Sequence, residues 1–217
     1  AEHHGLRFDS YNDLWEWSVT DLDAFWQSIC DFFDIEFSSP ASAVLAKRSM
    51  PGAEWFPGAK LNWAEYILAG GVKNPQKQAL VVHSETFGRR ELTWQELRDR
   101  VASLAAHLRD MGVGQGDRVA AILPNTENAI IACLAVTSLG AIWSLCAPDM
   151  GHVAILDRFQ QIEPKVLIYQ DNYLHAGKEV SRRAEVADVV GGLPSLLHHI
   201  AVGTQSTEIQ TETQTGA

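Results

Sequence analysis

The sequence predicts an α/β fold in which a helical, aromatic-rich cap precedes a parallel sheet. Arg118–Leu145 reads as strand, turn, helix, turn and strand. Within about thirty residues, that order is typical of a βαβ unit with two parallel strands. Serine, threonine and glycine stand where helices should begin and end. Five of the seven tryptophans lie within the first 68 residues, which sets that region apart from the sheet.

Residues 1–78 are predicted to form the cap. Asp9–Trp15 is an acidic, capped helix start, and Thr20 is expected to cap a second helix with Asp23 in the capping-box position. Trp55–Trp63 has too many turn formers for a helix, so we interpret it as a strap over the main domain. Phe and Trp dominate protein cores, so we interpret these aromatic residues as packing rather than as a ligand site.

Residues 79–202 are predicted to be the α/β domain, which opens with a β-hairpin and a helix. Ala79–His83 and Arg89–Leu92 are the hairpin strands. Thr93 with Glu96 three positions later forms a capping box, so a helix is expected over Thr93–Met111.

The sheet and its covering helices follow in alternation. The parallel strands are predicted at Arg118–Leu123, Ala141–Leu145 and Lys165–Tyr169. Glu127–Leu139 is apolar on nearly every face and should be a covered helix with Ile131 and Leu134 buried. Asp149 is expected to cap a further helix, His152–Ile162.

The last part of the chain is less regular. Asp171–Lys178 is predicted to be a polar loop, Glu179–Val190 a helix and His198–Val202 a short strand. Residues 203–217 consist mainly of Thr, Gln, Glu, Ser and Gly, which cannot bury enough apolar surface to offset the entropy of ordering. We therefore predict a disordered tail.

Composition excludes several classes of function. A net charge of −10 argues against binding to nucleic acid or to an anionic membrane, because both need basic surface. The longest apolar runs are far short of the roughly 18 residues that span a bilayer. The three cysteines are odd in number and unclustered, which predicts reduced thiols in a cytoplasmic protein and no metal site.

Familiar nucleotide and catalytic motifs are missing. Gly112–Arg118 has the wrong spacing for a dinucleotide fingerprint, and it leads into a strand instead of leaving one. A Rossmann-type nucleotide binder is therefore disfavoured. No phosphate-loop signature, HExxH or GxSxG is present, and no catalytic residue is assigned.

As a set, five stretches resemble the AMP-forming acyl-CoA synthetases of the adenylate-forming ligase superfamily. They are Trp55–Glu65, Leu92–Leu97, Asp117–Asn125, Gly140–Ser144 and Asp157–Leu167. The resemblance covers roughly residues 6–200. It implies a helical aromatic N-terminal cap plus the first parallel-sheet α/β subdomain of such a ligase.

The resemblance also implies a chemistry. Such enzymes activate a carboxylate with ATP and Mg²⁺ and then transfer the acyl group to coenzyme A (CoA); the branch most similar to this sequence uses acetoacetate. The family's phosphate loop, hinge motif and catalytic lysine lie downstream of the matched residues. The chain is thus expected to be the N-terminal third of a ligase, inactive and without tight cofactor binding when alone. A non-catalytic interaction module derived from the ligase is the alternative.

One ligand site follows from the resemblance alone. In the acetyl-CoA synthetase branch, an Arg-Ala-Gly-Arg run after the third strand holds the 3′-phosphate of CoA. The matching residues here are His175, Ala176, Gly177 and Lys178, so both arginines are replaced. Lysine offers a point charge, but the bidentate arginine contact is lost. A solvated loop with ordinary surface charges is the alternative interpretation.

Overall fold

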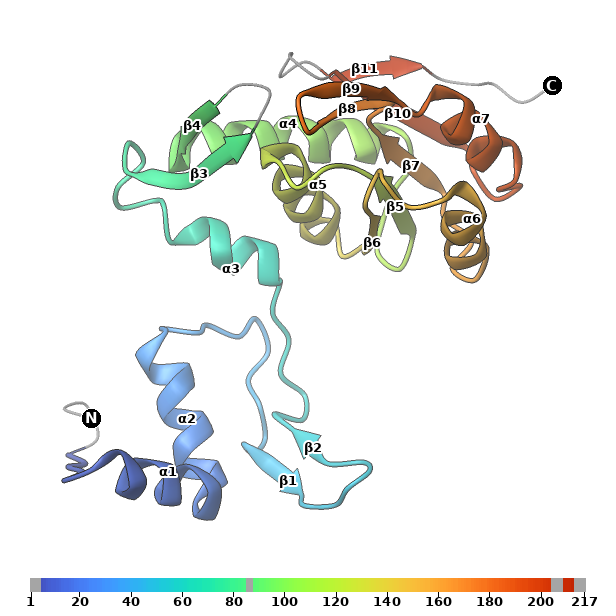
Figure 1. Cartoon of the computed structure of the whole chain (residues 1–217). Helices are drawn as coiled ribbons and strands as arrows, with labels where there is room; N and C mark the ends of the chain where they lie inside the picture. Colours follow the sequence, from blue (N-terminus) through green and yellow to red (C-terminus); the bar gives the residue numbers. More distant parts are fainter. Residues whose placement is uncertain (1–4, 85–87, 204–208, 213–217) are drawn as a thin grey trace. The chain divides into compact units, whose positions relative to one another are not determined.

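The computed structural model describes residues 5–84, 88–203 and 209–212. The chain divides into two compact units, Ala1–Asn62 and Trp63–Ala217 (Figure 1). The division lies before the boundary predicted after residue 78. The reason is helix α3 (Trp63–Ala69), whose fully buried Ala64 packs into the hydrophobic core of the second unit.

The first unit consists of two helices and a small antiparallel sheet. Its elements are α1 (Tyr11–Thr20), α2 (Leu22–Phe32), β1 (Leu45–Lys47) and β2 (Glu54–Trp55). A chain of aromatic contacts holds these elements together, with ring centroids 5.3 to 5.8 Å apart. In sequence of contact the rings belong to Phe8, Trp17, Phe25, Trp26 and Trp55. The predicted packing role accounts for these five side chains.

The two helix starts in this unit differ in how well the sequence predicted them. Ser10 caps α1 and forms both bonds of a capping box with Asp13, as the acidic start predicted. The predicted cap of α2 is wrong. Asp21 caps that helix by accepting a hydrogen bond from the N–H of Ala24, whereas Thr20 is the last residue of α1. A carboxylate one position later takes the role that the threonine was expected to fill.

The aromatic stretch after β2 packs against other residues of the first unit. Phe56 lies 5.7 Å from the ring of Phe37. Lys60 and Ser39 form an isolated antiparallel bridge, and Ser38 donates a backbone bond to the carbonyl of Lys60. The placement of this stretch as a strap over the main domain stays a prediction.

After α3, the second unit continues with the hairpin and helix that the sequence predicted. Strands β3 (Gln78–Ser84) and β4 (Gly88–Thr93) form an antiparallel hairpin, and α4 (Trp94–Asp110) follows directly. Thr93 and Glu96 form both bonds of the predicted capping box.

The main sheet of this unit has five described strands, of which four run parallel and one runs antiparallel. They are β5 (Arg118–Ile122), β6 (Ile142–Cys146), β7 (Val166–Tyr169), β10 (His198–Val202) and β11 (Ile209–Glu212). Their order is β11-β10-β7-β5-β6, with β11 antiparallel to β10. The three predicted parallel strands are confirmed. Strand β11 replaces the predicted disorder for four tail residues, because the outer edge of β10 offers backbone groups that it can pair.

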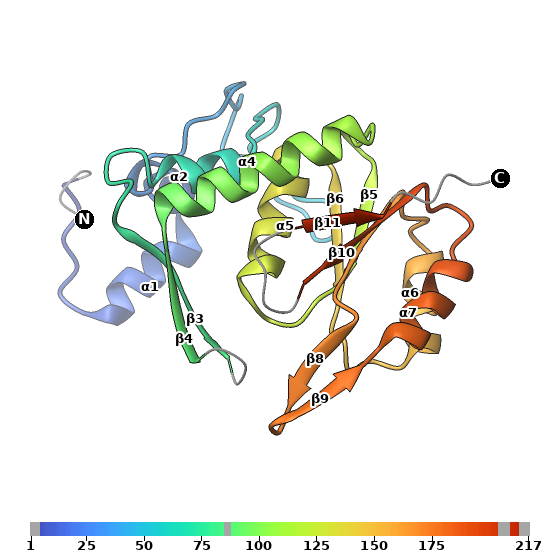
Figure 2. The same ribbon diagram turned by 90° about the horizontal axis from the view of Figure 1, so that it is seen from above.

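Helices cover both faces of this sheet (Figure 2). On one face, α4 and α5 (Glu127–Ser138) share a core with Val119 and Ile168. On the other, α6 (His152–Gln160) and α7 (Arg183–Gly191) pack over the alternating strand residues, Leu167 among them. Ile131 and Leu134 on α5 are buried, as predicted.

Two local predictions after β6 are wrong. Gly151 occupies the N-cap of α6 and no side chain caps it, so Asp149 lies outside the helix start. The predicted polar loop and the first turn of the predicted helix form a second hairpin instead, made of β8 (Asn172–His175) and β9 (Lys178–Ser181). Gly177 permits the tight turn that joins these strands, and α7 therefore begins only at Arg183.

Candidate functional site

Three loops follow the carboxyl ends of the parallel strands and meet at one edge of the sheet. They run from Pro124 to Thr126 after β5, from Ala147 to Met150 after β6, and through Gln170 into the β8–β9 hairpin after β7. Strands β6 and β7 lie on opposite sides of β5, so the connections reverse direction there. In open α/β sheets, ligands bind outside the carboxyl ends of the strands at such a reversal. This edge is where a ligand is expected.

The four residues predicted to bind a ligand form the turn of the β8–β9 hairpin. His175 and Lys178 pair across the hairpin, and Ala176 and Gly177 join them. The φ angles of these two residues, 49° and 73°, are both positive, as a type I′ turn requires. All four residues are exposed, at the end of a hairpin that projects from the sheet (Figure 2). The structure therefore brings the predicted residues together in a defined turn.

The cationic groups of this turn are available to a ligand. Directly opposed residues of an antiparallel pair carry their side chains on the same face, so His175 and Lys178 are neighbours. Neither side chain forms a hydrogen bond or ion pair with another residue of the described chain. The nearby acid Glu179 instead accepts a 2.7 Å hydrogen bond from Asn172. An anion at the turn would meet the ammonium group of Lys178 beside the imidazole of His175.

Two arginines, Arg182 and Arg183, lie at the base of the hairpin, close enough in the chain to supplement this charge. Both are engaged. The Arg182 side chain is only 15% exposed and donates to the carbonyl of Met150 over 2.6 Å. Arg183 is 81% exposed but pairs with Asp171 at 2.7 Å. That bond, and then the carboxylate charge, raise the pKa of the Arg183 guanidinium above its ordinary value. These arginines hold the hairpin instead of facing a ligand.

A further charged pair at this end of the sheet escaped the sequence analysis. Arg90 on β4 donates a 2.8 Å hydrogen bond to Oε1 of Glu127, the first residue of α5. Glu127 is 2% exposed, so the pair ties the β3–β4 hairpin to the start of this helix in a buried setting. The two residues are 37 positions apart, and no local pattern connects them.

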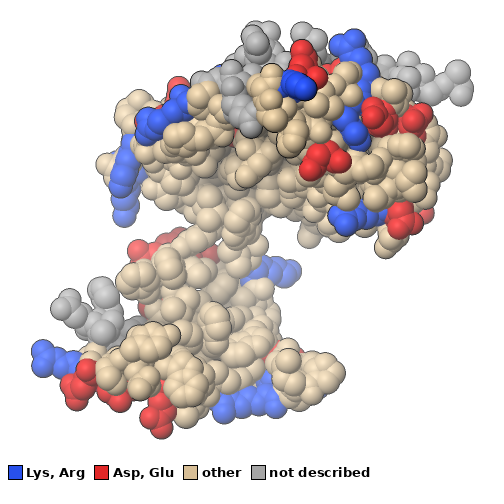
Figure 3. Space-filling view, in the orientation of Figure 1, with Lys and Arg blue, Asp and Glu red and all other residues tan. Residues whose placement is uncertain are grey.

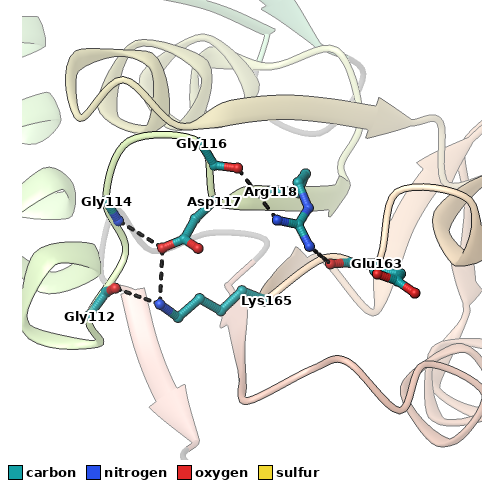
Figure 4. Close-up of polar contacts among 7 residues, drawn as sticks. All are labelled: Gly112, Gly114, Gly116, Asp117, Arg118, Glu163 and Lys165. Carbon is teal, nitrogen blue, oxygen red and sulfur yellow. Dashed lines mark hydrogen bonds and ion pairs between the residues drawn. The ribbon is translucent and has the colours of Figure 1, made fainter.

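The opposite edge of the sheet carries a second charged cluster (Figure 4). The Nζ atom of Lys165 donates to the carbonyl of Gly112 at 2.6 Å and to Oδ2 of Asp117 at 2.9 Å. Arg118 reaches the carbonyls of Ile162 and Glu163 at 2.7 and 2.9 Å. These charges bind the chain's own backbone where β5 and β7 begin, so the cluster is structural.

Cys30, Cys133 and Cys146 are free, and burial raises the pKa of each thiol. Cys30 and Cys146 are buried, as predicted, but Cys133 is only half-buried.

Within the described residues, no helix is long and apolar enough to cross a membrane. On the face that Figure 3 draws, Lys and Arg stand among Asp and Glu without forming a broad basic patch.

Comparison with known protein families shows which family the chain matches. A family model described as "AMP-binding enzyme" matches residues 70–215. The chain belongs to this family. A second model, "Acetyl-coenzyme A synthetase N-terminus", matches residues 11–66. Together the two models cover most of the cap and of the α/β domain. The resemblance to the AMP-forming synthetases is therefore confirmed.

Individual relatives agree with the family. Acetoacetyl-CoA synthetase of Macaca fascicularis is 42% identical over 88% of this chain, and that of Rhizobium meliloti is 39% identical over 89%. The solved structure of acetoacetyl-CoA synthetase from Streptomyces lividans superposes with a TM-score of 0.90 over 95% of the chain, at 47% identity. The chain spans 29% of the length of the two relatives and 32% of the solved chain.

Proposed function

We propose that this chain is the N-terminal portion of an ATP-dependent acid–CoA ligase that converts acetoacetate, ATP and CoA to acetoacetyl-CoA, AMP and pyrophosphate. The similarity to the Streptomyces lividans acetoacetyl-CoA synthetase, with 47% identity at a TM-score of 0.90, carries the proposal. The acid carboxylate would attack the α-phosphorus of ATP, release pyrophosphate and form an acyl-adenylate. The CoA thiol would then displace AMP. The three free thiols support a cytoplasmic location, where cysteines stay reduced.

The 217-residue chain alone is proposed not to ligate. It spans 29% of the relatives' length, and no group of three or more His, Cys, Asp or Glu among its described residues could hold a metal ion. We therefore assign no Mg²⁺ ligand to this chain. The test is ATP–pyrophosphate exchange with acetoacetate. The full-length ligase should incorporate labelled pyrophosphate into ATP, and the 217-residue chain should not. Turnover by the chain alone would contradict the proposal.

A non-catalytic interaction module is the second candidate. The observation that favours it is the exposed apolar surface of the first unit, where Tyr11 is 77% exposed, Phe32 70% and Trp15 55%. Large exposed aromatic groups often mark interaction surfaces. A full-length protein that shows no exchange with any acid, and yet binds a partner through this surface, would favour the module over the ligase.

A second acid competes with acetoacetate as the substrate. Malonamoyl-CoA synthetase of Penicillium aethiopicum is 34% identical over 89% of this chain, so a malonamate-type acid competes with acetoacetate. Higher identity to the acetoacetyl-CoA synthetases favours acetoacetate. Exchange rates of the full-length protein with acetoacetate, malonamate and acetate would rank the three acids. A higher kcat/KM with malonamate or acetate would replace acetoacetate in the proposal.

The hairpin turn is proposed to contact the 3′-phosphate of CoA. Lys178 supplies a free cation, His175 adds charge when protonated, and Gly177 leaves open space on the backbone between them. The contact is expected to be weaker than one made by two arginines, because neither side chain can form a bidentate bond to phosphate.

Lys178→Ala in the full-length ligase tests this contact. The KM for CoA should rise while the KM for ATP stays unchanged, because only the CoA phosphate meets the turn. Lys73→Ala, which removes another exposed lysine of the same unit, is the control and should change neither KM. In the unaltered protein, equal KM values for CoA and 3′-dephospho-CoA would instead support an ordinary solvated turn.

A further inference from the structure

The β8–β9 hairpin is stiff within itself, so its base decides where its turn lies. Four residue pairs connect its strands, from Asn172 with Ser181 to His175 with Lys178. A type I′ turn, with positive φ at both Ala176 and Gly177, matches the natural twist of the two strands. Any variation in the position of the turn must therefore come from the attachment of the hairpin to the sheet.

The strand that enters the hairpin is attached through the sheet itself. The N–H of Gln170 donates to the carbonyl of Ile122 at 3.0 Å and so extends the pairing of β7 with β5. The Gln170 side chain then donates to the carbonyl of Asn172 at 2.7 Å. These bonds fix where the hairpin begins, but they leave its second strand unattached to the sheet.

The strand that leaves the hairpin is attached through Arg182. Its N–H donates to the carbonyl of Asp171 at 2.6 Å, which closes the base. Its guanidinium donates to the carbonyl of Met150 at 2.6 Å and lies 3.4 Å from Glu185 on α7. Met150 belongs to the loop after β6, and β5 separates β6 from β7 in the sheet. Arg182 thus connects the hairpin base to a loop that follows a different strand of the sheet.

The energetics favour a positioning role over a ligand contact. A hydrogen bond from an ionised donor is roughly twice as strong as one between neutral groups. The side chain is 15% exposed, so water competes little with Met150 for this donor. Arg183, by contrast, is 81% exposed and pairs with Asp171 within the hairpin base itself. Arg182 alone of the two connects the base to a different strand's loop.

We infer that Arg182 is a positioning residue: it locks the β8–β9 hairpin to the loop after β6 and so fixes where Lys178 and His175 meet the CoA phosphate. This inference rests on the proposed CoA contact. Without the bond to Met150, the hairpin would pivot about its entry at Gln170, and its turn, at the far end of the lever, would move most.

The experiment compares CoA with 3′-dephospho-CoA in the full-length ligase. The ratio of their KM values reports the phosphate contact alone, because the two substrates differ only in that group. Arg182→Ala should bring the ratio to within about twofold of one, whereas ATP–pyrophosphate exchange, which needs no CoA, should keep its rate. Arg182→Lys, which retains one donor for Met150, should restore part of the ratio. Arg109→Ala, on the exposed end of α4, is the matched control and should leave the ratio unchanged.

The outcomes separate the inference from the proposal on which it rests. A ratio of one in the unaltered ligase would remove the phosphate contact and, with it, the role of Arg182. A ratio well above one that Arg182→Ala leaves unchanged would overturn the positioning role and keep the contact. A parallel loss of pyrophosphate exchange in both Arg182 variants would show a general structural role and would also overturn the inference.

Discussion

The two edges of the parallel sheet use the same kinds of charged residue in opposite ways. At the edge where the strands begin, Lys165 is 25% exposed and bonded to both Asp117 and a backbone carbonyl. At the edge where they end, the Lys178 side chain is exposed on a hairpin turn and forms no hydrogen bond or ion pair with a described residue. The first lysine has exchanged water for protein acceptors, whereas the second keeps its charge available for a ligand.

The difference shows that this unit uses different charged residues for stability and for ligand binding. A charge that already has its hydrogen-bonding partners contributes to folding but offers little to an incoming anion. A charge that is free on the surface adds little to stability and can meet a ligand at low desolvation cost. Arg182 belongs to neither class, because it is bonded and largely buried but holds the segment that carries the free charge.

The largest effect should come from the core that supports both edges. Ile131 and Leu134 on α5 are 5% and 3% exposed, and each replacement by alanine should lower the free energy of unfolding by about 2–5 kcal/mol, because methyl groups are lost and a cavity remains. Chemical denaturation measures this loss. Ile130 is 41% exposed on the same helix, so Ile130→Ala should change stability by only about 0.5 kcal/mol. Equal losses at Ile130 and Ile131 would contradict the described packing of α5.

The next largest effects should differ between the two edges of the sheet, with a loss of stability at one and of CoA affinity at the other. Lys165→Ala leaves Asp117 and the carbonyl of Gly112 without this donor and should cost about 1–2 kcal/mol of stability, with no change in the KM for CoA. Lys178→Ala should do the reverse and leave the unfolding midpoint unchanged while it raises that KM. Thermal unfolding and CoA kinetics on both variants provide the comparison. If both variants changed both quantities, the functional separation of the edges would be wrong.

The sequence predicted most of the sheet because its signals are local. The apolar run that became β5 and the capping box of Thr93 with Glu96 each lie within a few residues. Strand β11 was missed for the opposite reason. Its composition is that of a disordered tail, and only the free edge of β10 provides a partner for its backbone. A neighbour that the fold supplies is invisible in a window of sequence.

The candidate site, too, was only partly predictable from the sequence. The resemblance to a family gave the residues of the turn, but the hairpin that presents them was predicted to be a loop. The bond of Arg182 to Met150 spans 32 positions, and that of Arg90 to Glu127 spans 37. Bonds of this kind depend on how the strands are ordered in space. The function of each arginine could therefore not be read from the sequence.

Low pH should selectively reduce the stability that the charged cluster contributes at the edge of the sheet where the strands begin. Hydrogen bonds from the N–H of Gly114, and then from Lys165, lower the pKa of the Asp117 carboxyl below its ordinary value. A group whose pKa is lowered by folding stabilises the protein above its unfolded pKa, and that contribution is lost as the pH falls through the folded value. The stability difference between the unaltered chain and Asp117→Asn should therefore be largest near pH 7 and shrink below about pH 4. Denaturation curves between pH 7 and pH 3 measure it, and a constant difference would contradict the role of this carboxylate.

The smallest expected effect is confined to the turn of the β8–β9 hairpin, at the edge of the sheet where the strands end. Gly177 has a φ of +73°, and a Cβ added there would meet no other atom within 4 Å. Gly177→Ala should therefore cost about 1 kcal/mol through backbone strain alone. That strain should speed hydrogen exchange at the hairpin amides by about fivefold and lower the free energy of global unfolding by no more than the same amount, about 1 kcal/mol. Gly114 also has open space around it but no positive φ, so Gly114→Ala should leave exchange in the hairpin unaltered. If hairpin exchange rose with Gly114→Ala as much as with Gly177→Ala, backbone strain in the turn would not be its cause. A rise specific to Gly177→Ala, joined to a higher KM for CoA, would show that the turn's conformation as well as its charge presents Lys178.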